Sequence, residues 1–102
     1  MAGVFTTTVS AQAPTQVAVG IASAEVVAQN NYRVGMLLTN ISDSTIYLAF
    51  ASNTAVVGSG VTLLPQGGSF SMDDYIYTKE SVNAIAHTAG SALSVQEFVN
   101  LA

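Results

Sequence analysis

Short apolar runs, each alternating with polar residues and ending at turn-forming residues, most constrain the fold of this chain. Residues 15–21 show the pattern clearly, because Val17, Val19 and Ile21 recur at every second position. A period of two places such side chains on one face of a β-strand. Several runs of this kind, separated by Gly, Asn, Asp, Ser and Pro, are typical of a sandwich or barrel. The sequence therefore predicts a single antiparallel all-β domain.

Two hairpins are predicted from consecutive runs. Residues 34–39 and 45–50 flank residues 40–44, which read Asn-Ile-Ser-Asp-Ser and hold side chains that favour turns. Residues 82–88 and 92–99 flank a short Ala-Gly-Ser segment in the same way. Each pair is expected to form neighbouring antiparallel strands.

The remaining runs are shorter. Strands are predicted over residues 4–9, 61–64, 69–72 and 75–78. Residues 23–28 fit either a strand or one helical turn, because periodicity does not decide so short a run. Whether the strands form a sandwich or a closed barrel is left open by the pattern.

The chain is expected to divide at Pro14. Residues 15–102 are predicted to form the β-sandwich or barrel domain, and residues 1–14 an extended N-terminal arm. The arm is rich in Thr and begins with a run that includes Val4 and Phe5. Such a segment could add a strand to the sheet of a neighbouring subunit.

Charged residues are unusually scarce. They make up 8% of the chain, against roughly 25% in an ordinary soluble domain. Half of the residues are hydrophobic, and the polar remainder is mostly uncharged. Because a free monomer relies on a surface of mixed charge, we expect other subunits to cover much of this surface.

The same totals exclude several classes of partner. The net charge is −4, and Arg33 and Lys79 are the two basic residues. Binding to nucleic acid or to anionic lipid needs clusters of Lys and Arg, so neither partner is expected. The longest apolar run, residues 46–51, is far shorter than a membrane span of roughly 18–20 residues. The N-terminus lacks a positive region, so no secretory signal is expected.

No residue pattern predicts a catalytic site, a metal site or a cofactor site. The chain has no cysteine and one histidine, His87, which excludes a Cys–His nucleophile or a zinc site within one chain. Asp73 and Asp74 would point to opposite faces of a strand, so with Glu80 they are interpreted as solvated turn acids. Residues 58–60 lack the Lys of a phosphate-binding loop and are interpreted as a turn. The chain is therefore not expected to be an enzyme.

Arg33 and the tyrosines are candidate interface residues, as are Val4 and Phe5 in the arm. A guanidinium is best suited to a bidentate pair with a carboxylate, and Asp43, Asp74 and Glu97 are candidate partners, within the subunit or across an interface. Tyr32, Tyr47, Tyr75 and Tyr77 suit protein interfaces, where the ring packs and the hydroxyl stays wet. The alternative use of these rings is as stacking platforms for sugars.

A resemblance adds to this interpretation. The segments 31–33, 36–40 and 42–50, followed by 60–65, 82–86 and 93–98, resemble a pattern found in small structural proteins of tailed bacteriophages. The resemblance implies a compact β-sandwich or barrel on the virion, assembled in the host cytoplasm. It implies a capsid cement (decoration) protein, a homotrimer that stabilises the head by bridging copies of the major capsid protein. The alternatives are a head-fibre base, a tail adaptor or a carbohydrate-binding module that contacts the host.

Overall fold

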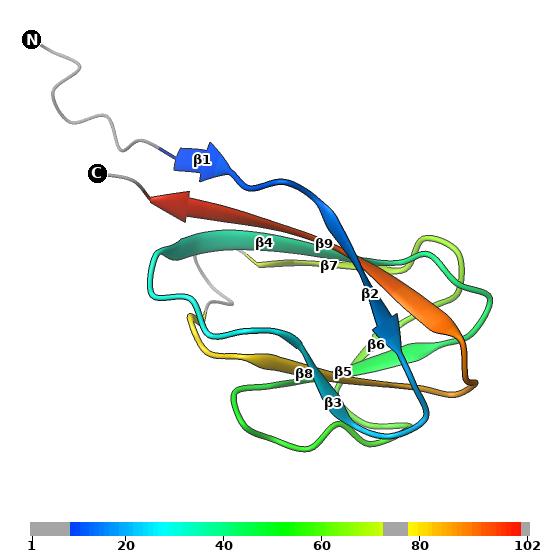
Figure 1. Cartoon of the computed structure of the whole chain (residues 1–102). Coiled ribbons are helices and arrows are strands. Elements are labelled where there is room, and N and C mark those ends of the chain that lie inside the picture. The colour runs from blue at the N-terminus through cyan, green and yellow to red at the C-terminus, as the bar shows by residue number, and fades with distance from the viewer. Residues whose placement is uncertain (1–8, 73–77, 101–102) are drawn as a thin grey trace, which may run out of the picture.

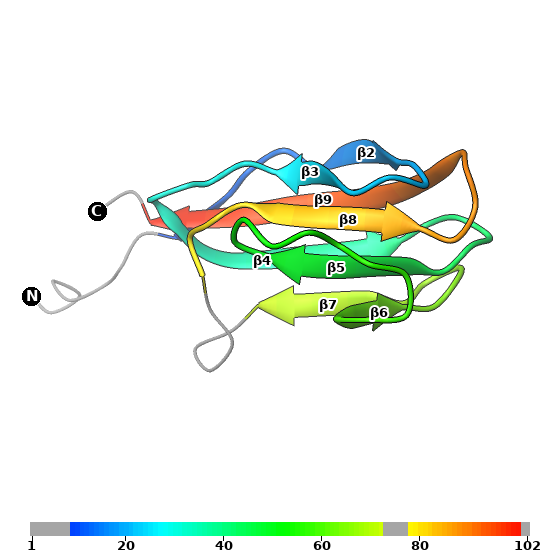
Figure 2. The same cartoon turned by 90° about the horizontal axis from the view of Figure 1, so that it is seen from below.

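The computed structural model describes residues 9–72 and 78–100, and these residues form two antiparallel sheets that pack face to face. Figure 1 shows the sheets edge-on as an upper and a lower layer, and Figure 2 looks onto the lower one. Sheet A, the upper layer, contains β1 (Val9–Ala11), β2 (Thr15–Val19), β4 (Arg33–Asn40), β7 (Ser69–Met72) and β9 (Ser91–Asn100). Sheet B contains β3 (Ala24–Val27), β5 (Ile46–Phe50), β6 (Val61–Leu63) and β8 (Val82–Ala86). The predicted all-β fold is confirmed, and the two separate sheets make it a sandwich.

The order of the strands is that of a jelly roll. Sheet A runs β2–β9–β4–β7 and sheet B runs β3–β8–β5–β6. The pairs β2–β9, β3–β8, β4–β7 and β5–β6 make one long antiparallel ribbon that turns back between β5 and β6. Rolling this ribbon adds the pairs β4–β9 and β5–β8, which close the two sheets. Eight strands wound in this way are characteristic of jelly-roll domains.

Both predicted hairpins are wrong. The strands before and after residues 40–44 are β4 and β5, which lie in different sheets. The strands on either side of the second turn, β8 and β9, also lie in different sheets. In the rolled ribbon every connection from β2 to β9 except β5–β6 passes from one sheet to the other. A short polar loop bridges two packed sheets as readily as two paired strands, so the turn residues did not distinguish them.

Most individual strands were predicted close to their observed bounds. Residues 23–28, which were ambiguous, contain β3 and therefore hold a strand. The alternation of residues 15–21 stops early, because β2 ends at Val19 and Ile21 lies beyond it, 65% exposed. The predicted strands over residues 4–9 and 75–78 fall almost wholly outside the described residues.

The core lies between the sheets and is built from the inward side of each strand. Leu38, Ile46 and Leu93 are fully buried, and they come from β4, β5 and β9. The rings of Phe50 and Phe70 pack across the two sheets, with their centroids 5.2 Å apart. The apolar side chains bury their surface here, which supplies the main driving force for folding.

The N-terminal arm is described from residue 9 onward. Its β1 pairs with the end of β9, where Val9 lies opposite Asn100 and Ala11 opposite Phe98. β1 and β2 therefore lie along the same edge of β9, one after the other (Figure 1). The candidate interface residues Val4 and Phe5 lie outside the described residues.

Candidate interaction surfaces and buried polar clusters

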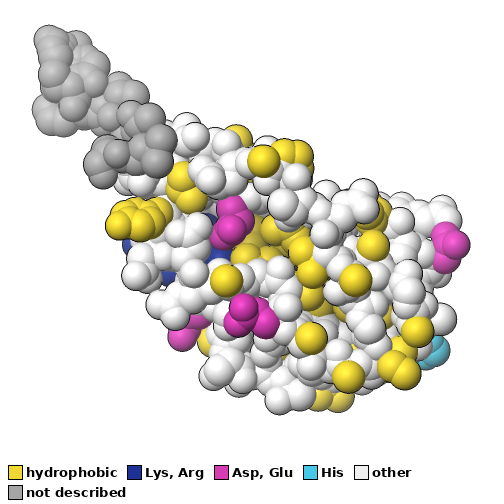
Figure 3. Space-filling model, viewed as in Figure 1, with side chains coloured by type: hydrophobic (Ala, Val, Ile, Leu, Met, Phe, Trp, Pro, Cys, Tyr) yellow, Lys and Arg dark blue, Asp and Glu magenta, His cyan; other side chains and the backbone are white. Residues whose placement is uncertain are grey.

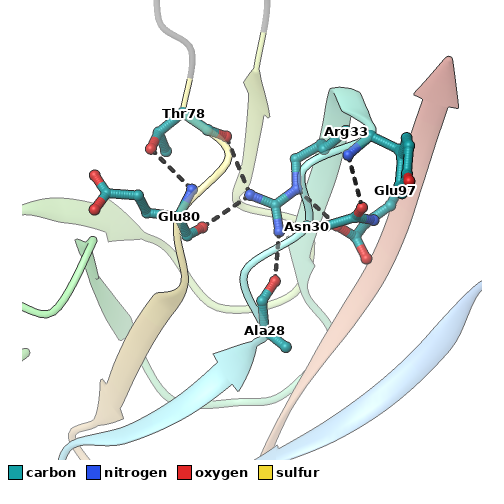
Figure 4. Close-up of polar contacts among 7 residues, drawn as sticks. Ala28, Asn30, Arg33, Thr78, Glu80 and Glu97 are labelled. Atoms are coloured by element: carbon teal, nitrogen blue, oxygen red, sulfur yellow. Dashed lines mark hydrogen bonds and ion pairs between the residues drawn. The ribbon is translucent and has the colours of Figure 1, made fainter.

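Arg33, the first residue of β4, forms the centre of a buried polar cluster. Its side chain is 0% exposed, and its Nε lies 2.6 Å from Oε2 of Glu97 on the neighbouring strand β9. Its Nη1 donates to the backbone carbonyls of Thr78 and Glu80 at 3.1 and 2.9 Å, and its Nη2 donates to that of Ala28 at 2.8 Å (Figure 4). A buried charge is tolerated when it is paired and hydrogen-bonded in this way.

The cluster closes one end of the sandwich. It joins the segment after β3, the segment before β8 and the strand β9, which are far apart in the sequence. Two backbone bonds reinforce it, from the Asn30 N–H to the Lys79 carbonyl and from the Asn100 N–H to the Tyr32 carbonyl. Of the three predicted partners of Arg33, Glu97 is the one observed among the described residues, and Asp74 lies outside them. The structure places the guanidinium inside the subunit, so the intrachain form of the prediction is the one observed.

A second buried polar group, Asn40, closes the other end. Its side chain is 0% exposed. Its Nδ2 donates to the carbonyls of Ser44 and Leu63, and its Oδ1 accepts from the backbone N–H and the hydroxyl of Ser42. Its backbone N–H and carbonyl bond to Gly68 and Gly67. The turn character of residues 40–44 was predicted, but the role of Asn40 in joining two loops depends on the tertiary structure.

The outer face of sheet A carries no charge among the residues that the structure describes. The inward residues of each strand are buried, so the residues between them point outward. Leu37 lies near the middle of this face, 41% exposed, between Gln96 of β9 and Ser71 of β7. We call this surface the sheet A face, and it consists of Gln16, Ala18, Leu37, Thr39, Ser69, Ser71, Ala92, Ser94, Gln96 and Phe98.

Phe98 fills a gap in the sheet A face. It lies opposite Gly35 at the bulge near the start of β4. A Cβ atom built on Gly35 would lie 3.6 Å from the Phe98 Cβ, so the ring occupies the space beside the glycine. An aromatic side chain over a glycine on the neighbouring strand restores packing that the glycine lacks.

The outer face of sheet B is partly covered. The loop of residues 51–60 folds against it, with Ala55 3% exposed and its N–H bonded to the Ser23 hydroxyl. Asn83 on β8 donates to the carbonyl of Asn53 in the same loop. Tyr47 lies on the uncovered part, half-buried opposite Thr62 of β6 and Ile85 of β8.

Figure 3 shows the side of the sandwich on which β2 and β3 form the edges. Most of the described surface in this view is uncharged, hydrophobic side chains gather along the middle, and the charged groups are few and scattered. The half-buried Val17 of β2 and Val26 of β3 pack against the core. The scarcity of charge seen in the sequence is therefore a property of the described surface as well.

Shallow hollows indent the described surface of the sandwich. The first, about 440 Å³, lies against β5, β6 and the loop of residues 51–60, and no ionisable side chain among the described residues lines it. The second, about 460 Å³, lies between the loops that follow β4 and β8, and Asp43 is the ionisable residue in its described lining. Within the described residues, neither hollow brings a base together with a nucleophile.

The other candidate residues are dispersed. His87 is exposed just beyond the end of β8, and no group of three metal-ligating side chains occurs in residues 9–72 and 78–100. Tyr32 is 70% exposed, at one end of the sandwich. Tyr75 and Tyr77 lie outside the described residues. No helix of the described chain is long and apolar enough to cross a membrane.

A solved structure has a fold similar to that of this chain. No family model matches the chain, and no curated protein does. A solved structure from the disulfide-linked pili that form Bacillus endospore appendages superimposes with a TM-score of 0.52. The match covers 94% of this chain and 91% of that one at 16% sequence identity. At this identity the likeness shows a shared fold alone, and the present chain has no cysteine with which to form a disulfide.

Proposed function

We propose that this chain is a non-enzymatic structural protein of a virion, and that it acts as a capsid cement (decoration) protein on a tailed bacteriophage head. The observation that carries the proposal is the scarcity of charge on the described surface of a chain of which 8% of the residues are charged. The resemblance of residues 25–98 to small phage structural proteins supports the virion assignment. The jelly-roll order of the strands is compatible with it, since viral capsid domains use this architecture among others.

The mechanism of such a protein is passive. It binds where capsid subunits meet and buries surface from several of them at once. A surface with few charges suits this role, because little charge loses its contact with water when another subunit covers it. In a homotrimer, as expected from the sequence, each copy needs only modest affinity, because linked copies bind the shell multivalently.

The lack of a catalytic arrangement among the described residues is compatible with this role. General acid–base catalysis needs a base within hydrogen-bond reach of the group it serves. His87 is exposed beyond β8, and the described linings of both hollows lack such a pair.

The experiment that tests the proposal is the location of the protein in phage particles. Particles from the source culture would be purified on a density gradient, probed with an antibody to the recombinant chain, and examined by immunogold electron microscopy. We expect the chain to co-sediment with the particles and the gold to label the heads. Labelling of tails or fibres would favour a tail adaptor or a head-fibre base. Absence from purified particles would overturn the virion assignment.

A second candidate is a subunit of a surface filament. The solved structure of similar fold comes from a pilus, and this is the observation that favours the candidate. Such a subunit would have to be joined without disulfides, since the chain has no cysteine. Electron microscopy of the concentrated pure protein separates the two candidates: regular filaments would favour the second, and small discrete oligomers the first.

A further inference from the structure

We propose that the sheet A face is the surface through which copies of this chain contact one another, with a second copy covering Leu37 and its neighbours. The inference rests on one part of the proposed function, namely that the chain works as an assembled subunit. It does not rest on the virion assignment, because any assembly that contains several copies of this chain can use a contact between them.

Electrostatics favours a second copy as the occupant. Each copy carries a net charge of −4, so contact between two copies is unfavourable wherever carboxylates meet. The described carboxylates lie elsewhere: Glu25 on the edge strand β3, Asp43 in a loop, Glu80 in the segment before β8, and Glu97 paired with Arg33 on the inner side of sheet A. When an identical chain packs on the sheet A face, no carboxylate of the described residues meets another carboxylate there. A basic partner would find no carboxylate of the described chain there to pair with.

The size of the face limits the strength of the contact. Its strands β2, β9, β4 and β7 contain 5, 10, 8 and 4 residues, which at about 3.3 Å a residue and about 4.8 Å between strands span roughly 430 Å². Two copies together would bury roughly 860 Å², the size of a weak contact rather than of a permanent one. Contact over this area requires most of the face, so a single charge near its middle would be buried without a partner.

The chemistry of the face also suits a protein contact. Leu37 and Phe98 supply apolar surface, and the Ser, Thr and Gln side chains around them can donate and accept hydrogen bonds. Sheets pack against each other about 10 Å apart with interdigitating side chains, and a strand face of alternating small and large residues allows this. Sheet B is less suited, because residues 51–60 already fold over part of its outer face.

The test compares two matched variants of the full chain by analytical ultracentrifugation. Leu37→Glu places a carboxylate near the centre of the sheet A face. Val57→Glu makes the same change at a side chain of similar exposure, 44% against 41%, in the loop on the opposite side of the sandwich. We expect Leu37→Glu to raise the dissociation constant for self-association at least about 10-fold, because an unpaired charge would be buried. Val57→Glu should leave it within about 2-fold, as expected of a surface change away from the contact.

Circular dichroism checks that each variant is folded. If Leu37→Glu does not fold, Ser71→Glu on the neighbouring edge strand is the second variant, with the same expected result. A wild-type chain that stays monomeric at high concentration would overturn the inference. Equal association of the two variants would also overturn it. The inference would also be overturned if Phe5→Ala dissociated the assembly while Leu37→Glu still associated, since the arm would then be the contact. Failure to find the chain in phage particles, by contrast, would leave the sheet A face contact standing.

Discussion

Replacing Glu97 by Gln tests whether the Arg33 cluster holds one end of the sandwich together. The substitution keeps the size of the side chain but removes the negative charge that lies 2.6 Å from Nε of Arg33. The guanidinium is 0% exposed and would keep its three backbone carbonyl partners. The buried guanidinium would then lose the carboxylate that lies against its Nε in the wild type.

The magnitude follows from the burial of the two partners. Breaking a buried ion pair by altering one partner costs about 3–5 kcal/mol. Two features reduce this value: the Glu97 side chain is 22% exposed, and the Gln oxygen can still accept a hydrogen bond from the guanidinium. We therefore expect the free energy of unfolding to fall by about 2 kcal/mol. For a domain of this size that change lowers Tm by roughly 8–16 °C.

Urea unfolding followed by far-ultraviolet circular dichroism measures the effect. Wild type and variant must be compared at a concentration where both have the same oligomeric state, because association itself adds stability. Glu25→Gln is the matched control: it removes an exposed carboxylate from the edge strand β3 and should change stability by less than about 0.5 kcal/mol. A loss in Glu97→Gln no greater than that of the control would refute the reasoning.

A double variant tests the same pair independently. Arg33→Met together with Glu97→Leu leaves no charge from this pair behind, and apolar replacement of a whole buried pair is often nearly neutral. The double variant should therefore lose clearly less stability than the sum of the two single variants. Additive losses would show that the two side chains do not depend on each other.

Three further predictions concern residues in or beside the loops. Asn40→Ala leaves buried carbonyl and N–H groups without their partner and should lower the free energy of unfolding by about 3 kcal/mol in the urea assay. Gly60→Ala should lower Tm more than Gly58→Ala: both glycines have positive φ, but a Cβ on Gly60 would collide with the Leu48 carbonyl, whereas Gly58 faces open space. Equal effects would rule out the collision with Leu48 as the cause. His87→Ala should leave both Tm and self-association unchanged, and a loss of either would reveal an unrecognised role for this exposed side chain.

The candidate surface could be anticipated only in part. The shortage of charge predicted that subunits cover much of the surface, but it did not say where. Leu37 was not predicted to be a surface residue, because one leucine within an apolar run looks like a core residue. Its place on the outer face follows from the register of β4 against β7 and β9, which buries Met36 and Leu38 and turns Leu37 outward.

The Arg33 cluster was anticipated in its chemistry and not in its geometry. The need of a lone arginine for a carboxylate partner can be inferred from the sequence, and Glu97 was one of three candidates. The contact of Glu97 with Arg33 depends on β4 and β9 being neighbours, which no local signal encodes. The three backbone carbonyls that complete the cluster come from segments whose positions only the rolled ribbon fixes.

By itself the sequence determined that the chain is all-β, where most strands lie and which side chains share a face, because these properties follow from a local period of two. The tertiary structure alone decided which strands pair. Residues 34–39 and 45–50 looked like a hairpin and belong to opposite sheets. The alternation of apolar and polar residues determines which face of a strand is buried, but it does not determine which strand pairs with it. Pairing is decided when the whole ribbon rolls around a shared core.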